Sequence, residues 1–454
     1  MFKIYNCKAK VILIAISIII VCISIFAAVV LKDDRIYSGV YIDGVNVSGL
    51  EINLAIEKLN DAIDQLIPIK REVLEYDGNA WEYPFENLGI GFNTEEAVKK
   101  AYSIGRNGNI FYRLYSIIKT RINEREIYLE VYFDRELMTE ALKNIKQQVD
   151  RQEKNAQVQF VDNKITLVNH EVGKKLDINK NLDNWTAKLE GKDYTALRLI
   201  VDEIEPEIKE SDIKNIDGII GKFSTKFNQG DADRSYNIKL ACSKINGILL
   251  MPGQEFSMNK SLGPRTSENG YKDAPVILKN ELVKSTGGGV CQVTTTLYNA
   301  VLLSKLKVVE RQHHSMPLGY IDMGRDATIA GDYIDFKFRN SNGYPVAIFS
   351  SVKGNVINVY ILGKDREDGM NVVLKSQIVE KYEPQGEEIE YSDEIPENER
   401  VVIREPKIGY KVLLYRETYG KDGALLLREK ISEDIYAPVK AKVKVGRKIT
   451  QEMP

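Results

Sequence analysis

The chain has 454 residues, and its 63 basic and 65 acidic side chains give a formal net charge of −2 at pH 7. This balance gives no support to nucleic-acid binding, which requires a basic surface. Hydrophobic residues make up 43% of the chain, a proportion typical of globular domains and not of disordered segments.

An uncharged apolar run occupies residues 11–31, and three lysines precede it. About 20 apolar residues span a bilayer as a helix, whereas the apolar core of a secretory signal has only about 7–15 residues. The run therefore favours a transmembrane anchor, although Ala27 and Ala28 leave cleavage possible. By the positive-inside rule, residues 1–10 form a cytoplasmic tail and the bulk of this single-pass chain lies outside the cell membrane.

An internal repeat follows the anchor. Residues 74–101 align with residues 158–185, and each copy turns between two short apolar runs, through Asp77-Gly78-Asn79 or through Asp162-Asn163-Lys164. A glycine and a polar stretch then precede a helical pattern in both copies. The repeat predicts a β-hairpin followed by a helix, used twice, in an α+β domain over residues 36–205.

Three aromatic residues, Tyr102, Phe111 and Tyr112, lie between the two copies in a segment rich in turn residues. Their rings could stack on sugars or pack in the hydrophobic core, and the sequence leaves both interpretations open.

A second α+β domain is predicted over residues 215–365, after a charge-rich connector at 202–217. A helix over 236–246 places Cys242 in the core. Antiparallel strands are expected after it, and alternation in one of them predicts a polar face made of Tyr333, Asp335, Lys337 and Arg339. The expected strands are 308–311, 333–340, 345–351 and 355–362.

The C-terminal part is predicted to be a linker at 381–399 followed by a small all-β module at 400–450. Glycines separate its apolar runs, and the module is too short for a large core.

The most informative stretch is GGGVCQVTTTLYNA at 287–300. Its glycines, Gly287, Gly288 and Gly289, bring Cys291 to the first turn of a predicted helix. Unpaired N–H groups and the helix dipole lower the pKa of a thiol there, and the thiolate is the nucleophilic form. Two structural alternatives remain open, namely a buried cysteine beside a tight turn and a disulfide with Cys242.

This stretch resembles the VanW family of envelope proteins, which is named after an accessory reading frame of glycopeptide-resistance clusters. The resemblance covers residues 215–365. The family commonly has a histidine where this chain has Gln312, whereas His314 matches directly. The other matching pieces are FSTKF (223–227), NIKLACSKINGILLMPGQEFSMN (237–259), ERQHHS (310–315), GRDATIAGDYIDFKF (324–338) and YPVAI (344–348).

The flanking regions resemble two further envelope modules. Residues 36–205 are similar to a peptidoglycan-binding domain, and the C-terminal module is similar to one named for its five glycines, with Gly409, Gly423, Tyr436 and Gly446 in place. These resemblances imply peptidoglycan or another wall polymer as the partner, with a role in glycopeptide resistance or wall maintenance. No cofactor is expected, and no metal-binding spacing such as CxxC or HExxH occurs.

Cys291, His314 and Asp326 follow one another in the order used by papain-like and transglutaminase-like folds. In such a site the thiolate attacks a carbonyl carbon, the imidazole carries the proton and the carboxylate fixes the imidazole tautomer. We expect Gln292 or the N–H of Cys291 to stabilise the oxyanion. Arg325 could clamp a substrate carboxylate, and the three glycines would shape the binding site.

Alternatives exist for each of these roles. His314 could cap a strand end, Arg325 could hold a loop carboxylate, and the orienting acid could be one of three other aspartates. Those aspartates are Asp322, Asp332 and Asp335. Three functions therefore stay open: a peptidoglycan-binding protein without catalysis, a cysteine hydrolase or acyl-transferase acting on wall peptides, and a scaffold for wall-synthesis partners.

Overall fold

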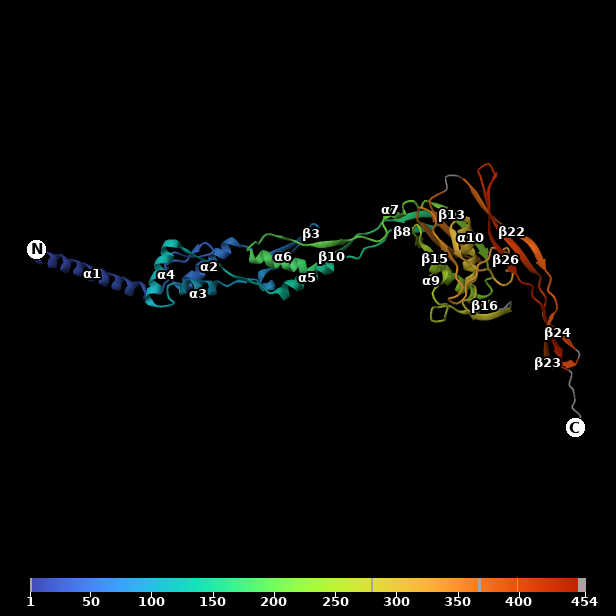
Figure 1. Ribbon diagram of the computed structural model, residues 1–454, viewed down its shortest axis with the longest axis horizontal. Helices are drawn as coiled ribbons and strands as arrows, with labels where there is room; N and C mark the ends of the chain where they lie inside the picture. The colour runs from blue at the N-terminus through green and yellow to red at the C-terminus, as the bar shows by residue number, and fades with distance from the viewer. Residues whose placement is uncertain (1, 279–280, 366–368, 398, 448–454) are drawn as a thin grey trace, which may run out of the picture. The chain divides into compact units, whose positions relative to one another are not determined.

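A computed structural model of the chain describes residues 2–278, 281–365, 369–397 and 399–447 (Figure 1). The chain divides into two compact units. Unit 1 comprises Met1–Glu153 and Val172–Glu205, and unit 2 comprises Lys154–Glu171 and Pro206–Pro454. The predicted domain bounds at Met1 and at 448–450 lie outside the described residues.

Unit 1 begins with the long apolar helix α1 (Phe2–Val30), which contains all of the anchor predicted at 11–31 except its last residue. Its segment Lys10–Val30 is long and apolar enough to cross a membrane. The other helices of unit 1 are α2 (Ile52–Leu66), η1 (Phe85–Leu88), α3 (Thr94–Ser103), α4 (Ile110–Asn123), α5 (Arg135–Val149) and α6 (Ile178–Glu190).

Short strands form four small sheets in unit 1, in the orders β2-β1-β6, β11-β3-β4, β10-β12 and β5-β7. They are β1 (Val40–Ile42), β2 (Val45–Asn46), β3 (Arg71–Tyr76), β4 (Asn79–Pro84), β5 (Gly91–Phe92), β6 (Arg125–Ile127), β7 (Val131–Tyr132), β10 (Gly173–Leu176), β11 (Leu197–Arg198) and β12 (Val201–Ile204). The apolar faces of α2, α3, α5 and α6 pack against these sheets in one core, with Trp185 fully buried.

Both copies of the predicted hairpin form. The first hairpin, β3–β4, turns at Asp77 and Gly78, and the second, β8 (Gln157–Val161) with β9 (Lys164–Val168), turns at Asp162 and Asn163. All four turn residues have positive φ, as a two-residue hairpin turn requires. The second hairpin, however, belongs to unit 2, so the predicted domain at 36–205 does not include residues 154–171.

The aromatic segment between the copies contains the end of α3, a turn and the start of α4. The side chain of Asn109 begins α4 by accepting a hydrogen bond from the N–H of Tyr112. Tyr102 packs against the core of unit 1, whereas Phe111 and Tyr112 are exposed. Core packing is therefore the wrong interpretation for these last two residues.

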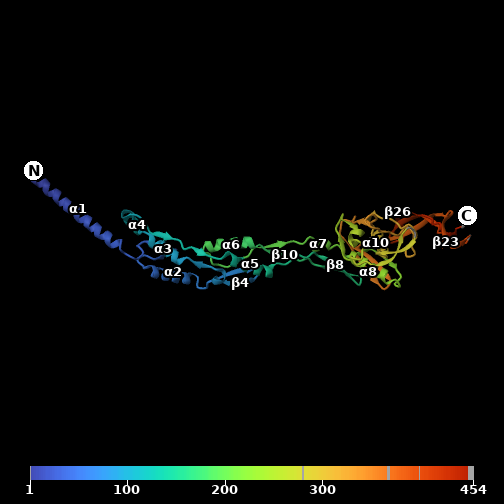
Figure 2. The ribbon, with the colours of Figure 1, turned by 90° about the horizontal axis from the view of Figure 1, so that it is seen from below.

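Unit 2 is built around α10 (Val290–Leu303), all of whose residues except Cys291 and Leu303 are buried. A four-stranded antiparallel sheet, β13-β21-β20-β14, and the helix α8 (Ala232–Ile245) pack against it, and Figure 2 shows α8 beside α10. The remaining elements of this region are α7 (Glu210–Ile213), β13 (Gly218–Lys226), β14 (Ile248–Leu250), β15 (Glu255–Ser257), α9 (Met258–Leu262), β16 (Asp273–Leu278), β17 (Glu281–Thr286), β18 (Lys307–Glu310), β19 (Lys337–Arg339), β20 (Val346–Lys353) and β21 (Val356–Gly363).

Two predictions for this region need correction. The 202–217 segment is not only a connector, since it contains part of β12 and all of α7 and buries Ile213 and Ile216. The expected polar strand face is also wrong at Asp335, which is buried. Its carboxylate accepts hydrogen bonds from the hydroxyl of Ser257 and the N–H of Asn259, so it holds the start of α9.

The expected linker at 381–399 is wrong, because strands occupy most of it. The C-terminal strands are β22 (Asn371–Tyr382), β23 (Glu387–Glu397), β24 (Arg400–Arg404), β25 (Gly409–Tyr419), β26 (Leu425–Tyr436) and β27 (Ala441–Gly446). They form two sheets, β22-β25-β26 and β23-β27-β24. Leu374 and Leu414 belong to the same core as α10, and Arg416 donates a hydrogen bond to the carbonyl of Leu302. The β module thus begins earlier than predicted and packs on the helix that carries Cys291.

The attachment of the second hairpin to unit 2 is testable through Phe160. Its ring centroid lies 5.6 Å from that of Phe349 and 4.9 Å from that of Tyr360. Because Phe160→Ala removes this half-buried ring, we expect the free energy of opening of residues 157–168 to fall by about 2 kcal/mol. Hydrogen–deuterium exchange of those amides measures the change. Val161→Ala, whose side chain is exposed, is the control, and equal exchange in both variants would refute the contact.

Candidate thiol active site

The turn between β17 and α10 places Cys291 in the first turn of the helix, as predicted. Gly287 and Gly289 have φ values of 87° and 103°, a region that residues with a side chain rarely adopt. At Gly288 a Cβ would lie 2.7 Å from the backbone of Ala274 and of Pro275. Three glycines are therefore needed to bring the chain into α10 against the β16–β17 hairpin.

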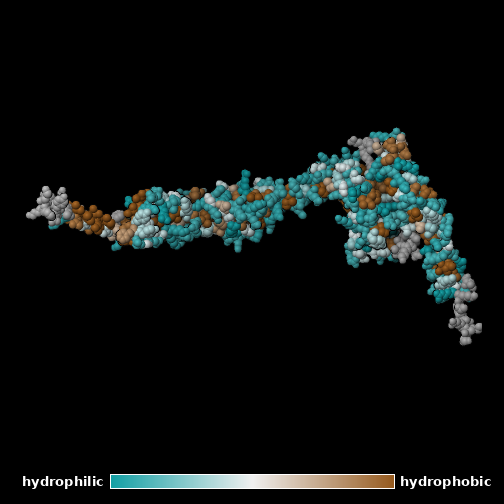
Figure 3. All heavy atoms as spheres, in the orientation of Figure 1, coloured by the Kyte–Doolittle hydropathy of each residue, from teal (hydrophilic) through white to brown (hydrophobic). Residues whose placement is uncertain are grey.

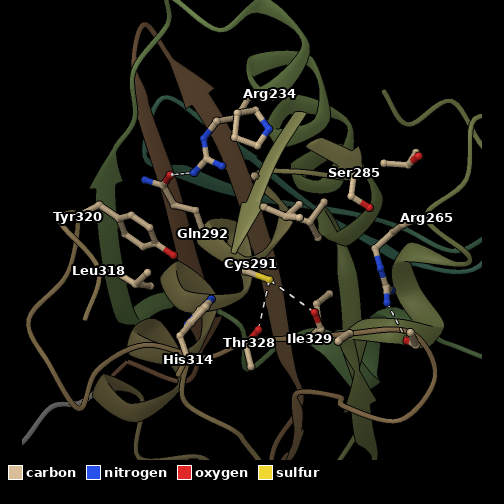
Figure 4. Close-up of a pocket in the computed structure, with 18 residues that line it drawn as sticks. Arg234, Arg265, Ser285, Cys291, Gln292, His314, Leu318, Tyr320, Thr328 and Ile329 are labelled. Atoms are coloured by element: carbon tan, nitrogen blue, oxygen red, sulfur yellow. Dashed lines mark hydrogen bonds between the residues drawn. The ribbon is translucent and has the colours of Figure 1, made fainter. Parts of the chain in front are cut away.

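The sulfur of Cys291 lies at the centre of the site (Figure 4). It is 3.5 Å from the hydroxyl oxygen of Thr328 and 3.6 Å from the carbonyl oxygen of Ile329. In the part of the chain that the structure describes, the N–H of Cys291 donates to no backbone carbonyl. Cys242 is buried in the core and both cysteines are free, so the disulfide between them is not formed.

His314 and Asp326 lie together beside this sulfur. The carboxylate oxygen Oδ2 of Asp326 is 2.7 Å from Nδ1 of His314 and accepts a hydrogen bond of 2.6 Å from its backbone N–H. Both side chains are buried. Since Asp326 occupies Nδ1, the other ring nitrogen of His314 is left for the thiol, and Figure 4 shows a ring nitrogen directed toward Cys291.

The three groups shift one another's pKa values. Burial raises the pKa of Cys291, but the hydrogen bond and charge of His314 outweigh it and lower the pKa to about 7. Burial lowers the pKa of His314, but Asp326 and Cys291 outweigh it and raise the pKa to about 9. Burial raises the pKa of Asp326, but the hydrogen bonds and charge of His314 and the hydrogen bond from Tyr436 outweigh it and lower the pKa to about 2. Between pH 7 and pH 9, the pKa values of Cys291 and His314, the site therefore holds a thiolate, an imidazolium and a carboxylate.

Residues of the C-terminal module fix the carboxylate. The hydroxyl of Tyr436, at the end of β26, donates to Oδ1 of Asp326 at 2.6 Å and accepts from the N–H of Gly324 at 2.7 Å. Arg311 donates to both carboxylate oxygens of Asp434 at 2.7 Å and, through Nε, to the carbonyl of Asp326. β26 therefore supplies two of the side chains that hold the loop carrying Asp326.

A pocket of about 560 Å³ opens beside Cys291 and His314. Two guanidinium groups, those of Arg234 and Arg265, line it together with the phenol ring of Tyr320, and Figure 4 shows these side chains around the sulfur. Since both arginines are cationic and the pocket walls are partly apolar, the cavity suits a molecule that carries a carboxylate.

The predicted binding residues play other parts in this structure. The amide nitrogen of Gln292 donates to Thr225 and to the carbonyl of Lys226, and its oxygen accepts from Arg234. Both N–H groups of the Gln292 side-chain amide are thus already hydrogen-bonded within the protein, and the amide oxygen orients the guanidinium of Arg234. The predicted role of Gln292 as an oxyanion donor is therefore not supported by this geometry.

Arg325 does not line the pocket, contrary to its expected role as a substrate clamp. It donates to Asn299 and to Asp322, and its guanidinium lies 4.9 Å from the ring centre of Phe223. Of the competing aspartates, Asp322 thus pairs with Arg325, and Asp335 holds the start of α9. Asp326 is the one that reaches His314.

Sequence reasoning missed Arg234, Arg265, Tyr320, Thr328 and Tyr436. The two arginines come from α8 and from the loop after α9, and neither stands in a motif with Cys291 in the sequence. Tyr436 lies 110 residues beyond Asp326. No local sequence pattern indicates a contact over such a separation. Only knowledge of which distant residues lie together in the fold could have predicted it.

Comparison with known proteins agrees with the domain order. Three family models match, described as "VanW like protein" at residues 233–362, "Putative peptidoglycan binding domain" at 81–198 and "G5 domain" at 375–448. The uncharacterized protein YoaR of Bacillus subtilis is 31% identical over 233 residues, which are 51% of this chain and 76% of that protein. The chain therefore belongs to the VanW-like family, and its domains make it a cell-wall-associated protein.

A second relative is the vancomycin B-type resistance protein VanW of Enterococcus faecalis. It is 32% identical over 113 residues, which are 24% of this chain and 41% of that protein. Two solved structures match the C-terminal part. The IgA1 protease G5 domain is 25% identical with a TM-score of 0.14 and covers 18% of this chain and 99% of its own. The HP0197-G5 structure is 26% identical with a TM-score of 0.11 and covers 17% and 99%.

The pKa of Cys291 predicts how its alkylation depends on pH. A thiol pKa of about 7 means that the rate of iodoacetamide labelling should reach half its maximum near pH 7, against about 8.5 for an ordinary cysteine. In Asp326→Asn the imidazolium loses its counter-charge, so the midpoint should move toward 8.5. Peptide mapping by mass spectrometry follows Cys291 alone. An unshifted midpoint in Asp326→Asn would contradict the coupling.

The contact between Tyr436 and Asp326 predicts a loss of stability. Tyr436→Phe deletes the donor to a buried carboxylate and the acceptor of the Gly324 N–H. We expect it to destabilise unit 2 by about 1–3 kcal/mol and to slow the labelling of Cys291. Thermal unfolding and labelling rates measure both effects. Tyr391→Phe, an exposed tyrosine of the same module, is the matched control and should change neither.

Proposed function

We propose that the chain is a membrane-anchored cell-wall protein that binds peptidoglycan and acts on wall peptides as a cysteine acyl-transferase or hydrolase. The observation that carries the proposal is that Asp326 bonds to His314 and His314 bonds to Cys291, with the last two residues in the wall of a pocket. A purely structural cysteine needs neither an imidazole partner nor a lowered pKa. This arrangement therefore favours catalysis over a binding module that lacks it.

The reaction would proceed through a thioester. The thiolate of Cys291 attacks the carbonyl carbon of a peptide bond, and the imidazolium of His314 gives its proton to the departing amine. The S–C bond forms first and gives a tetrahedral intermediate, and its collapse breaks the C–N bond and leaves an acyl group on the sulfur. An amine of a second peptide, or water, then attacks the thioester carbonyl while His314 takes up its proton. The S–C bond breaks in this step, and the thiolate of Cys291 leaves and is regenerated. Transfer to an amine cross-links two peptides, and transfer to water hydrolyses one.

The surrounding groups support this chemistry. The N–H of Cys291 has no backbone partner and stands at a helix N-terminus, which makes it the donor for the oxyanion of the tetrahedral intermediate. Arg234 and Arg265 hold the carboxylate of the substrate, the role that the sequence had suggested for Arg325, since both line the pocket. Peptide stems of the wall end in a carboxylate, which such a pair can hold by charge and hydrogen bonds.

The other domains would bring the site to its substrate. The helix α1 serves as the anchor, the region at residues 81–198 that matches a peptidoglycan-binding domain holds the wall, and the bulk of the chain lies outside the membrane. A role in wall maintenance or in glycopeptide resistance would follow from chemistry on wall peptides. Peptidoglycan binding without turnover is the second candidate function, supported by the two flanking binding modules.

Incubation of the purified chain with wall peptides tests the catalytic proposal. We expect new cross-linked or trimmed peptides by mass spectrometry, no products with Cys291→Ala, and a rate about 10²–10⁴-fold lower with His314→Ala. Cys22→Ala, in the membrane segment, is the control and should keep full turnover. Equal sedimentation of the parent and Cys291→Ala with peptidoglycan, with no products from either, would leave the binding function alone.

A further inference from the structure

The helix α4 of unit 1 carries an apolar face that the protein does not cover. Its inner side is formed by Ile117 and Thr120, which are buried. Phe111, Tyr115, Ile118 and Ile122 recur at helical spacing on another side, and their exposed fractions are 81%, 59%, 51% and 72%. Four large apolar side chains in one stripe are more than the scattered exposure that is normal on a soluble surface.

Basic residues border this stripe. At 100° per residue, the apolar face is centred between the directions of Lys119 on one side and Arg121 on the other, and both are exposed. An apolar stripe with aromatic residues and flanking cations is the pattern of a helix that lies in the surface layer of a membrane. There the rings enter the boundary between headgroups and acyl chains, while the cations meet the lipid phosphates.

The place of α4 in unit 1 puts it beside the end of the membrane helix. Arg113, on α4, donates to the carbonyl of Leu31. Arg106, just before α4, donates to the carbonyls of Asp33 and Arg35 at 2.7 Å each. Tyr37 donates to the carbonyl of Val30, the last residue of α1. Figure 1 shows α4 at the end of unit 1 from which α1 emerges, and Figure 3 shows apolar atoms there.

We propose that α4 lies flat in the outer headgroup layer of the membrane, with the stripe Phe111, Tyr115, Ile118 and Ile122 buried in lipid. This proposal rests on the anchoring by α1 that forms part of the proposed function. The partner is the lipid bilayer itself. α4 then fixes how unit 1 stands on the membrane, which a single spanning helix cannot do because it rotates about its own axis.

Tryptophan fluorescence of the full chain in lipid nanodiscs tests the proposal. Phe111→Trp adds a probe to the stripe, and Leu66→Trp adds a matched probe at an exposed apolar position at the end of α2. The nanodiscs contain phosphatidylcholine and phosphatidylglycerol, with or without bromine on the acyl chains. The emission of the parent chain, from Trp81 and Trp185, is subtracted.

We expect brominated lipid to quench the added emission of Phe111→Trp at least twofold and to leave that of Leu66→Trp unchanged. Ile18→Trp, within α1, reports separately on the anchor. Quenching at residue 18 without quenching at residue 111 would overturn the α4 proposal and leave the anchor intact. No quenching at residue 18 would instead refute the anchoring, and equal quenching at residues 66 and 111 would show that the stripe has no special place in the membrane.

Discussion

The organisation of unit 2 depends on the buried carboxylate of Asp326. Removing a carboxylate from water is costly by several kcal/mol unless hydrogen bonds and charges replace its hydration. Here the backbone and ring of His314, the hydroxyl of Tyr436 and the nearby guanidinium of Arg311 supply them. Because Asp326 therefore stays ionised, it fixes the tautomer and raises the pKa of His314, and the imidazolium in turn keeps Cys291 as a thiolate.

This requirement explains why the C-terminal module is part of the site and not an appendage. Tyr436 and Asp434 belong to β26, yet their hydrogen-bond partners lie on the loops that carry His314 and Asp326. Arg311 is itself buried and bridges the carboxylates of Asp326 and Asp434. Such a network is stable only when every member is present. The β module thus contributes to the chemistry of Cys291 without touching the pocket.

The sequence revealed the features that depend on neighbouring residues. The glycines before Cys291, the helix that follows them and the tight turns that begin at Asp77 and at Asp162 each have local physical causes and form as predicted, although each turn is one residue shorter than expected. The order of Cys291, His314 and Asp326 also predicted their meeting. Features set by distant contacts were missed, since no local pattern shows that β26 reaches Asp326.

The wrong assignments have the same origin. Polar composition suggested a linker at 381–399, but pairing between β23 and β27 makes most of it a strand. Alternation placed Asp335 on a polar face, yet the start of α9 needs its carboxylate. Arg325 stands next to Asp326 in the sequence, whereas the pocket draws its cations from Arg234 and Arg265. Proximity in the sequence is a poor guide to which charged side chain lines a cavity.

The protonation of His314 at pH 8 tests the account most directly. Nitrogen-15 NMR of labelled histidine distinguishes an imidazolium from a neutral ring, and His314→Gln assigns the signal among the three histidines. With a His314 pKa of about 9 and a Cys291 pKa of about 7, we predict an imidazolium at pH 8 in the parent chain and a neutral ring in Asp326→Asn. A neutral His314 at pH 8 in the parent chain would contradict the thiolate–imidazolium pair.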